Sequence, residues 1–113
     1  MTSPVSAEIL DEIVRRIVAT ADPDEIILFG SAARGEMGTH SDLDLLVVKA
    51  GVRHRGHLTE EIYMGLLGVE QAVDVIVATP EDVERYRDVH ALVIKAAMQE
   101  GTVIYERQPA TSR

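Results

Sequence analysis

Two apolar runs joined by a glycine-containing segment decide the fold of this chain. IILFGSAARG occupies residues 26–35, and SDLDLLVV occupies residues 41–48. Neither apolar run alternates with polar residues, which is typical of strands that are buried on both faces. The first run stops at a Gly-Ser pair, and the second opens on two aspartates. The stretch therefore predicts two core strands, a turn between them, and paired carboxylates beside that turn.

Helical and strand patterns flank these two runs. A helix is predicted before the first run, because apolar residues recur there at the spacing of one helical face. These residues are Ile9, Leu10, Ile13, Val14, Ile17 and Val18, with Ser6 as the candidate cap and residues 22–24 as the end of the helix. Leu58, Ile62, Leu66 and Leu67 predict a second helical stripe that follows a loop over residues 49–56.

The second half of the chain continues the alternation of strands and helices. Residues 73–77 are rich in β-branched side chains and predict a third strand. Thr79 and Pro80 mark the start of a helix, another helix is predicted over residues 88–100, and residues 102–105 predict an edge strand. This order predicts an α/β (α+β) fold in which a small mixed sheet packs with helices.

Length and composition limit the classes of protein to consider. The 113 residues predict a single domain, 1–113, with a frayed tail over about residues 107–113. The absence of cysteine excludes disulfides and thiolate metal sites, and it fits a cytoplasmic protein, as does the lack of a secretory signal or an apolar run long enough to span a membrane. The net charge of −8 argues against broad nucleic-acid binding.

The two aspartates of the second run predict a metal site. Asp42 and Asp44 are one residue apart on a strand, so their side chains point to the same face while Leu43 points to the other. Two neighbouring carboxylates repel each other unless a cation lies between them, and Mg²⁺ prefers oxygen ligands. The alternative for an isolated Asp-x-Asp is a solvated strand start.

The Gly-Ser turn favours the metal-site interpretation. Gly30 can adopt backbone conformations that are closed to other residues and lets a phosphate approach the main chain. Ser31 adds a hydroxyl, and Arg34, one turn later, could reach a triphosphate. We therefore expect Gly30, Ser31 and Arg34 to bind a nucleotide, although a solvated arginine is an equally good interpretation of Arg34.

The combined motif resembles the nucleotidyltransferase superfamily that includes DNA polymerase β, and within it the minimal nucleotidyltransferase (MNT) branch. Gly30-Ser31 is followed, after residues 32–41, by Asp42-Leu43-Asp44 at the start of a strand. Asp74 is flanked by valines on a strand that we expect to be buried, where an aspartate is costly unless it meets a cation or, as the alternative, a structural hydrogen-bond partner. The resemblance implies a third carboxylate on a later strand, where Asp74 fits and Glu70 is the fallback. It also implies that Asp42, Asp44 and Asp74 are catalytic residues that bind two Mg²⁺ ions, with ATP as the nucleotide substrate.

The same resemblance suggests a partner. Minimal nucleotidyltransferases often act as antitoxins that adenylylate a tyrosine of a helical HEPN toxin, and we expect that role here, in a hetero-oligomer with the toxin. The alternatives are a binding module that neutralises its partner by contact alone, a nucleotidyltransferase acting on a small molecule, and a subunit that senses nucleotide without turnover. Small-molecule transfer is disfavoured because the extra helical domain that it usually requires is missing from the chain.

A basic cluster remains outside the motif. Arg53, His54, Arg55 and His57 fall in and just after the predicted loop. We expect them to be solvated or to counter the acidic surface; a contact with nucleotide or a partner is the alternative.

Overall fold

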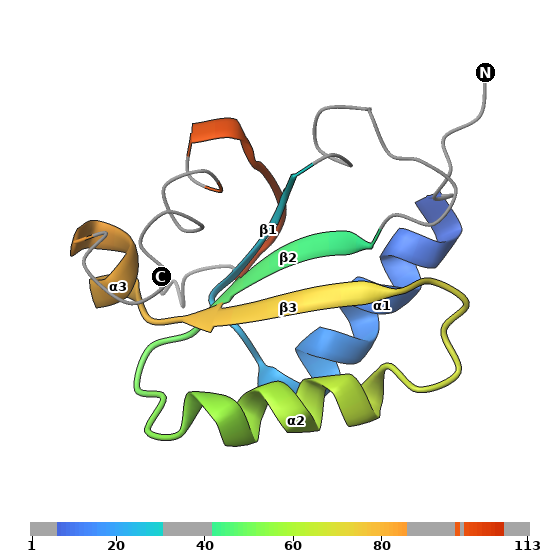
Figure 1. Cartoon of the computed structure of the whole chain (residues 1–113), viewed down its shortest axis with the longest axis horizontal. Helices are drawn as coiled ribbons and strands as arrows, with labels where there is room; N and C mark the ends of the chain where they lie inside the picture. Colours follow the sequence, from blue (N-terminus) through green and yellow to red (C-terminus); the bar gives the residue numbers. More distant parts are fainter. Residues whose placement is uncertain (1–6, 31–41, 86–96, 98, 108–113) are drawn as a thin grey trace, which may run out of the picture.

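Four strands form one mixed sheet in the computed structural model, which describes residues 7–30, 42–85, 97 and 99–107 (Figure 1). The strands are β1 (Glu25–Phe29), β2 (Leu43–Val48), β3 (Val73–Ala78) and β4 (Thr102–Glu106). Their order across the sheet is β3-β2-β1-β4. β1 runs antiparallel to both of its neighbours, whereas β2 and β3 are parallel. The sheet therefore has two edges, formed by β3 and β4.

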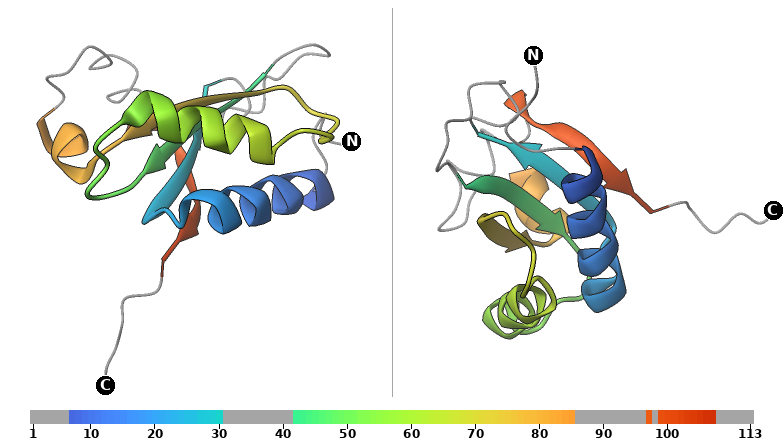
Figure 2. Two further views of the ribbon diagram at one scale, coloured as in Figure 1. Left: turned by 90° about the horizontal axis from the view of Figure 1, so that it is seen from below. Right: turned by 90° about the vertical axis from the view of Figure 1, so that its right-hand side faces the viewer.

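Among the described residues, helices cover the two faces of this sheet unequally. α1 (Ala7–Ala21) and α2 (Arg55–Gly65) lie side by side on one face, as both views of Figure 2 show. α3 (Pro80–Arg85) follows β3 and packs through Val83 against the other face. In the described part of the chain, no helix is both long and apolar enough to cross a membrane.

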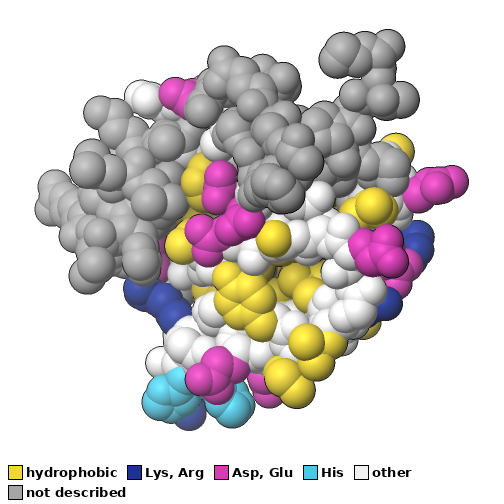
Figure 3. Space-filling model, turned by 45° about the vertical axis from the view of Figure 1, so that its right-hand side comes forward, with side chains coloured by type: hydrophobic (Ala, Val, Ile, Leu, Met, Phe, Trp, Pro, Cys, Tyr) yellow, Lys and Arg dark blue, Asp and Glu magenta, His cyan; other side chains and the backbone are white. Residues whose placement is uncertain are grey.

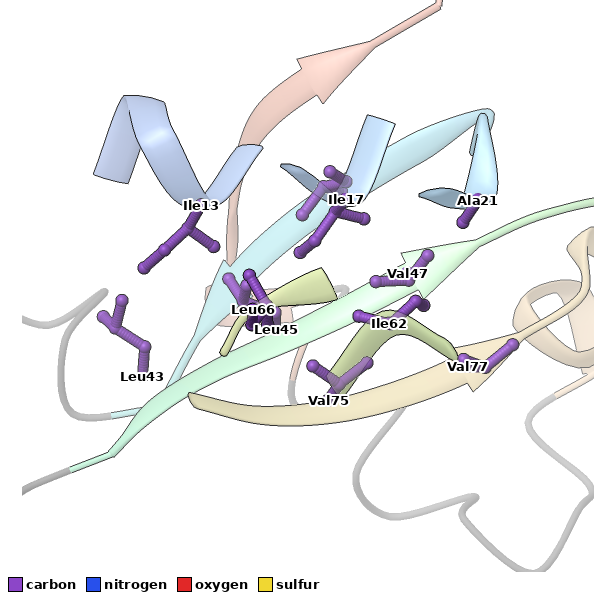
Figure 4. Close-up of a cluster of buried hydrophobic side chains, with 11 residues drawn as sticks. Ile13, Ile17, Ala21, Leu43, Leu45, Val47, Ile62, Leu66, Val75 and Val77 are labelled. Carbon is purple, nitrogen blue, oxygen red and sulfur yellow. The ribbon is translucent and has the colours of Figure 1, made fainter. Parts of the chain in front are cut away.

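The first core cluster lies between the sheet and the α1–α2 pair. Ile13 and Ile17 from α1 and Ile62 from α2 point toward Leu45 and Val75 in the sheet (Figure 4). The apolar stripe predicted over residues 9–18 is the face that α1 buries, so this prediction is confirmed. The helix ends where Asp22 takes a positive φ of 48° and its N–H donates to the Val18 carbonyl at 2.9 Å.

The second core cluster lies on the opposite face and accounts for the continuous apolar runs. Leu46 and Val48 of β2 pack there with Ile27 and Phe29 of β1, while their neighbours in the chain face α1 and α2. The prediction of two strands buried on both faces is confirmed. Ala97, from the predicted last helix, also packs into this cluster.

The prediction of the second helical stripe is wrong for one residue, Leu67. Ile62 and Leu66 are buried, but Leu67 is 65% exposed. α2 ends at Gly65, and the chain turns toward Gly68, whose φ is +92°. The Arg16 side chain stabilises this turn by donating to the Leu67 carbonyl at 2.7 Å. The turn takes Leu67 off the helical face on which periodicity alone would place it.

The predicted cap of α3 is confirmed by two reciprocal hydrogen bonds. The Asp82 N–H donates to Thr79 Oγ1 at 3.1 Å, and the Thr79 N–H donates to Asp82 Oδ2 at 3.0 Å. Each bond satisfies a backbone donor that the first helical turn leaves free. Pro80 occupies the first helical position, where its missing N–H costs nothing.

β4 confirms the predicted edge strand at the end of the chain. It pairs with β1, and the Gly101 N–H before it donates to the Ala97 carbonyl at 2.8 Å. The Arg107 N–H then donates to the Asp24 carbonyl at 2.9 Å. Ser6, residues 88–96 of the predicted last helix and tail residues 108–113 lie outside the described residues.

Glu25 predicts a measurable dependence of stability on pH. Partial burial, and then the charges of Glu106 and Asp24, raise the pKa of the Glu25 carboxyl. Glu25 lies directly opposite Glu106 in the β1–β4 register. Because the folded-state pKa is raised, protonation favours the folded form at low pH, and this contribution is lost as the pH rises through the folded pKa.

We therefore expect Glu25→Gln to increase the free energy of unfolding at neutral pH by a few tenths of a kcal/mol, and at most about 1 kcal/mol, because a like-charge cross-strand pair is removed. The gain should shrink from neutral pH to an acid pH below the raised pKa of the Glu25 carboxyl, because the residue is then protonated. Urea unfolding at both pH values measures the difference. Glu8→Gln, at an exposed position of α1, is the control; an equal gain for both variants would contradict the cross-strand explanation.

Candidate active site

Two of the predicted carboxylates occupy matched positions at the start of the parallel strand pair. Asp44 of β2 and Asp74 of β3 are direct partners in the parallel register. Adjacent strands are about 4.8 Å apart, so side chains at matched positions project beside each other on one face. Alternation along β2 places Asp44 on the face opposite to Leu43 and Leu45, which pack toward α1 and α2. The fold thus creates a carboxylate pair, Asp44 and Asp74, from two segments 30 residues apart.

Gly30 permits the close packing of Asp44 against the end of β1. Its φ is +76°, in the left-handed region that favours glycine. A Cβ at this position would lie 2.2 Å from Asp44 Oδ2 and 3.1 Å from Asp44 Cγ. The predicted need for glycine is therefore confirmed, and its reason is visible: the neighbour that requires the space is the Asp44 carboxylate itself.

Asp42 lies one residue before β2 and is exposed, whereas Leu43 between the two aspartates is buried. Among residues 7–30, 42–85, 97 and 99–107, no group of three or more His, Cys, Asp or Glu side chains is arranged to hold a metal ion. Mg²⁺ is commonly bound by one or two carboxylates together with waters and substrate phosphates. Asp44 and Asp74 can supply the one or two carboxylates of such a site, and Asp42 lies two residues before Asp44 in the chain.

The surroundings of Asp74 differ from the sequence-based expectation of a buried aspartate. Asp74 is exposed at the second position of β3, which is an edge strand of the described sheet. The cost of burying a lone carboxylate therefore cannot explain this residue. Exposure does give Asp74 access to a substrate. The fallback residue, Glu70, is also exposed and lies before β3, outside the register with Asp44.

Tyr63 contacts Asp74, and it was not predicted to be a site residue from the sequence. From α2, its hydroxyl accepts a hydrogen bond from the Val75 N–H at 2.8 Å and lies 3.4 Å from Asp74 Oδ1, to which it donates. The hydroxyl of Tyr63 could have indicated this contact, because the hydroxyl of a partly buried tyrosine usually has a hydrogen-bond partner.

The basic cluster is separate from the carboxylate pair. Arg53, His54, Arg55 and His57 are exposed around the start of α2, where they line a surface hollow with Glu60. Arg55 pairs with Asp82 of α3 at 2.9 Å, which places the cluster near the C-terminal end of β3, whereas Asp74 lies near its N-terminal end. In Figure 3 the histidine side chains accordingly gather at one extremity of the molecule. These positions agree with solvated residues that counter acidic neighbours.

Ser31 and Arg34, the other two predicted nucleotide-binding residues, lie outside the described residues. Their assignment therefore stays a prediction from the motif. Gly30, directly before Ser31, is the last described residue of this segment.

The chain is similar to a known protein family and to solved structures. The family model described as "Polymerase beta, Nucleotidyltransferase" matches residues 11–110. A crystal structure of a candidate nucleotidyltransferase from Sulfolobus solfataricus is similar, with a TM-score of 0.61 and 22% identity over 88% of this chain and 79% of that one. A chain in a crystal structure of a toxin–antitoxin with AMP-PNP has a TM-score of 0.57 and 20% identity over 87% of this chain and 73% of that one.

At these identities the two structures show a shared fold. No curated protein sequence matches this chain. The family match extends from α1 to beyond β4 and includes Gly30, Asp44 and Asp74. The chain therefore belongs to the polymerase β-type nucleotidyltransferase family.

Proposed function

We propose that this protein transfers AMP from ATP to a hydroxyl of a partner protein, with the Asp44–Asp74 pair at the centre of the site. The observation that supports this most is the register match of Asp44 and Asp74, together with the glycine that leaves room for Asp44. A carboxylate pair on one sheet face, beside a turn with positive φ, suits a triphosphate and its cation.

The proposed roles follow from the position of each residue. Gly30 keeps the chain close to Asp44 without a side chain, and Ser31 and Arg34 bind the triphosphate. Asp42, Asp44 and Asp74 would hold Mg²⁺, which when bound neutralises phosphate charge and orients the nucleotide. Asp74 is exposed and thus accessible to an incoming hydroxyl, so it is also our candidate for the group that accepts the proton.

The reaction that we propose exchanges one bond for another at the α-phosphorus. The acceptor oxygen forms a bond to the α-phosphorus, and the bond from that phosphorus to the oxygen bridging toward the β-phosphate breaks. Pyrophosphate leaves with the bridging oxygen, and the hydroxyl proton passes to the carboxylate. The products are an AMP ester of the acceptor and pyrophosphate.

We propose that the acceptor is a tyrosine of a HEPN-type toxin and that the modification neutralises the toxin. The motif's resemblance to minimal nucleotidyltransferases supports this assignment, as does the fold shared with a chain of a toxin–antitoxin structure. An acidic chain of net charge −8 also suits a basic protein partner.

A growth assay distinguishes neutralisation of the partner by catalysis from neutralisation by contact alone. The protein encoded by the neighbouring gene is expressed alone, with the wild-type chain, or with the Asp42→Asn/Asp44→Asn double variant, and cell growth is followed. We expect rescue by the wild-type chain and none by the double variant. Co-purification of both forms with the partner is the control for folding and binding.

Full rescue by the double variant would contradict catalytic neutralisation and identify a module that acts by contact. Incubation of purified wild-type chain and partner with Mg²⁺ and ATP complements the growth assay. Mass spectrometry should then locate AMP on a tyrosine of the partner.

A further inference from the structure

We infer that an exposed apolar patch at the end of α2 is the surface on which the partner protein docks, and that a basic amphipathic helix of the partner lies on it. The patch consists of Tyr63, Met64 and Leu67 and is called the α2 patch. This inference rests on the proposed function, because it names the surface by which the chain holds the protein that it modifies.

The α2 patch contains most of the exposed large hydrophobic side chains in the described part of the chain. Among residues 7–30, 42–85, 97 and 99–107, four such side chains are exposed, and three of them belong to the patch. Met64 is 66% exposed, and the Leu67 N–H donates to the Met64 carbonyl at 3.3 Å, one turn further on. On the side of the molecule shown in Figure 3, hydrophobic side chains gather among Asp and Glu side chains. An apolar patch bordered by charged residues is typical of a protein interaction site, and tyrosine and methionine are enriched in such sites.

The charges around the α2 patch favour a basic partner. Glu60 lies one helical turn before the patch, and Glu70 lies in the connection between the patch and β3. Both are exposed, and within the described part of the chain neither takes part in an ion pair. Arg16, whose guanidinium reaches the Leu67 carbonyl, is already paired with Glu12 at 2.8 Å. Lysine or arginine side chains of a docked segment would therefore meet unneutralised carboxylates at both ends of the patch.

The open edge of β3 beside the patch distinguishes a docked helix from a docked strand. A partner strand adds to a sheet by bonding the free backbone groups of an edge strand. The Val75 N–H already donates to the Tyr63 hydroxyl at 2.8 Å, so Tyr63 occupies this part of the edge. Met64 and Leu67 are three residues apart, and a helix lying along α2 can pack its own i, i+3 and i+4 side chains against such a row. We therefore assign a helix to the patch.

The α2 patch also borders the candidate active site. The Tyr63 hydroxyl lies at the edge of β3, 3.4 Å from Asp74 Oδ1. A partner on the patch therefore lies beside the exposed Asp74, which is the proposed proton acceptor. Holding the acceptor protein next to the reacting groups supplies the proximity that transfer between two molecules requires.

The apolar contacts are tested by calorimetric titration with the purified protein encoded by the neighbouring gene, without ATP or Mg²⁺. We expect Met64→Ala/Leu67→Ala to weaken binding about 30-fold, because a few central apolar side chains dominate the affinity of protein interfaces. Both residues are exposed, so circular dichroism should show an unchanged fold. Val103→Ala is the matched control, because Val103 is the exposed large hydrophobic residue outside the patch, on β4, and it should bind as the wild-type chain does.

The acidic border is tested in the same titration. Glu60→Lys/Glu70→Lys should weaken binding about tenfold, and the loss should be smaller at high salt, because the contact with a basic partner is electrostatic. Glu84→Lys, at an exposed position of α3, is the control for the change in net charge and should leave the affinity within about twofold of the wild-type value.

Photo-crosslinking identifies the occupant of the patch. Benzoylphenylalanine placed at Met64 should attach to a helix of the partner that carries apolar residues beside lysine or arginine. The same group placed at Val103 should attach to the partner far less. Attachment from Met64 to a strand of the partner, or to a second copy of this chain, would overturn the inference.

The outcomes separate this inference from the proposed function. If the partner binds the wild-type chain and Met64→Ala/Leu67→Ala equally well, the docking surface is wrong and adenylyl transfer stands. If the variant loses binding but the wild-type chain attaches no AMP to the partner with ATP and Mg²⁺, the docking surface stands and the proposed transfer fails. If the wild-type chain does not bind the partner at all, both fail.

Discussion

Asp44→Asn is expected to lower the rate of adenylyl transfer about 10³-fold while the protein remains folded, because several kcal/mol of charge stabilisation at the triphosphate are lost. Asparagine keeps the size of the side chain and one acceptor oxygen, but it removes the negative charge. Asp44 packs against Gly30 and lies beside Asp74, so the change affects the centre of the proposed site.

Single-turnover transfer from ATP to the partner measures this effect, and circular dichroism checks the fold. Asp11→Asn is the matched control, because Asp11 is an exposed aspartate on α1. The control should react at the wild-type rate. A folded Asp44→Asn variant that transfers AMP within tenfold of the wild-type rate would show that Asp44 does not bind the cation.

Gly30→Ala should reduce both stability and activity. The added Cβ would lie 2.2 Å from Asp44 Oδ2, so the carboxylate or the turn must move. A non-glycine residue at φ +76° is also strained, and we expect a loss of about 1–3 kcal/mol in the free energy of unfolding. Displacement of Asp44 should slow transfer by about 10²-fold, the loss that follows when a catalytic group shifts by about 1 Å.

Gly51 supplies a closely matched control for this substitution. Its φ is +77°, but a Cβ there would meet no atom within 4 Å. Gly51→Ala therefore introduces the same backbone strain without a contact at the site. Both variants should lose stability, and only Gly30→Ala should lose activity. Equal activity in the two variants at a temperature where both are folded would contradict the role assigned to Gly30.

Local patterns in the sequence were sufficient to predict most of the elements. The apolar run over residues 43–48, the stripe of α1 and the Thr79 cap each depend on neighbours within a few positions, and the structure confirms all three. The positive φ of Gly30 was likewise expected from its place between a strand and a turn. Such features depend on backbone sterics and periodicity, which a single sequence contains.

Features that depend on the order of the strands in the sheet could not be predicted from local sequence patterns. Nothing in residues 73–77 indicates that β3 is an edge strand, so Asp74 was expected to be buried although it is exposed. The contact of Tyr63 with Val75 joins positions 12 apart in the sequence and requires α2 to pack along that edge. The exposure of Leu67 depends on a turn held by Arg16, a residue from another helix. These are tertiary effects that override local propensity.

The most direct test of adenylyl transfer is to follow the two ends of the triphosphate separately. The wild-type chain and its partner are incubated with Mg²⁺ and with ATP labelled either at the α-phosphate or at the γ-phosphate. We predict that the α-label becomes covalently attached to the partner, that the γ-label is released in pyrophosphate, and that Asp44→Asn abolishes the attachment. Attachment of the γ-label, or no attachment of either label to a folded partner, would contradict the proposed transfer.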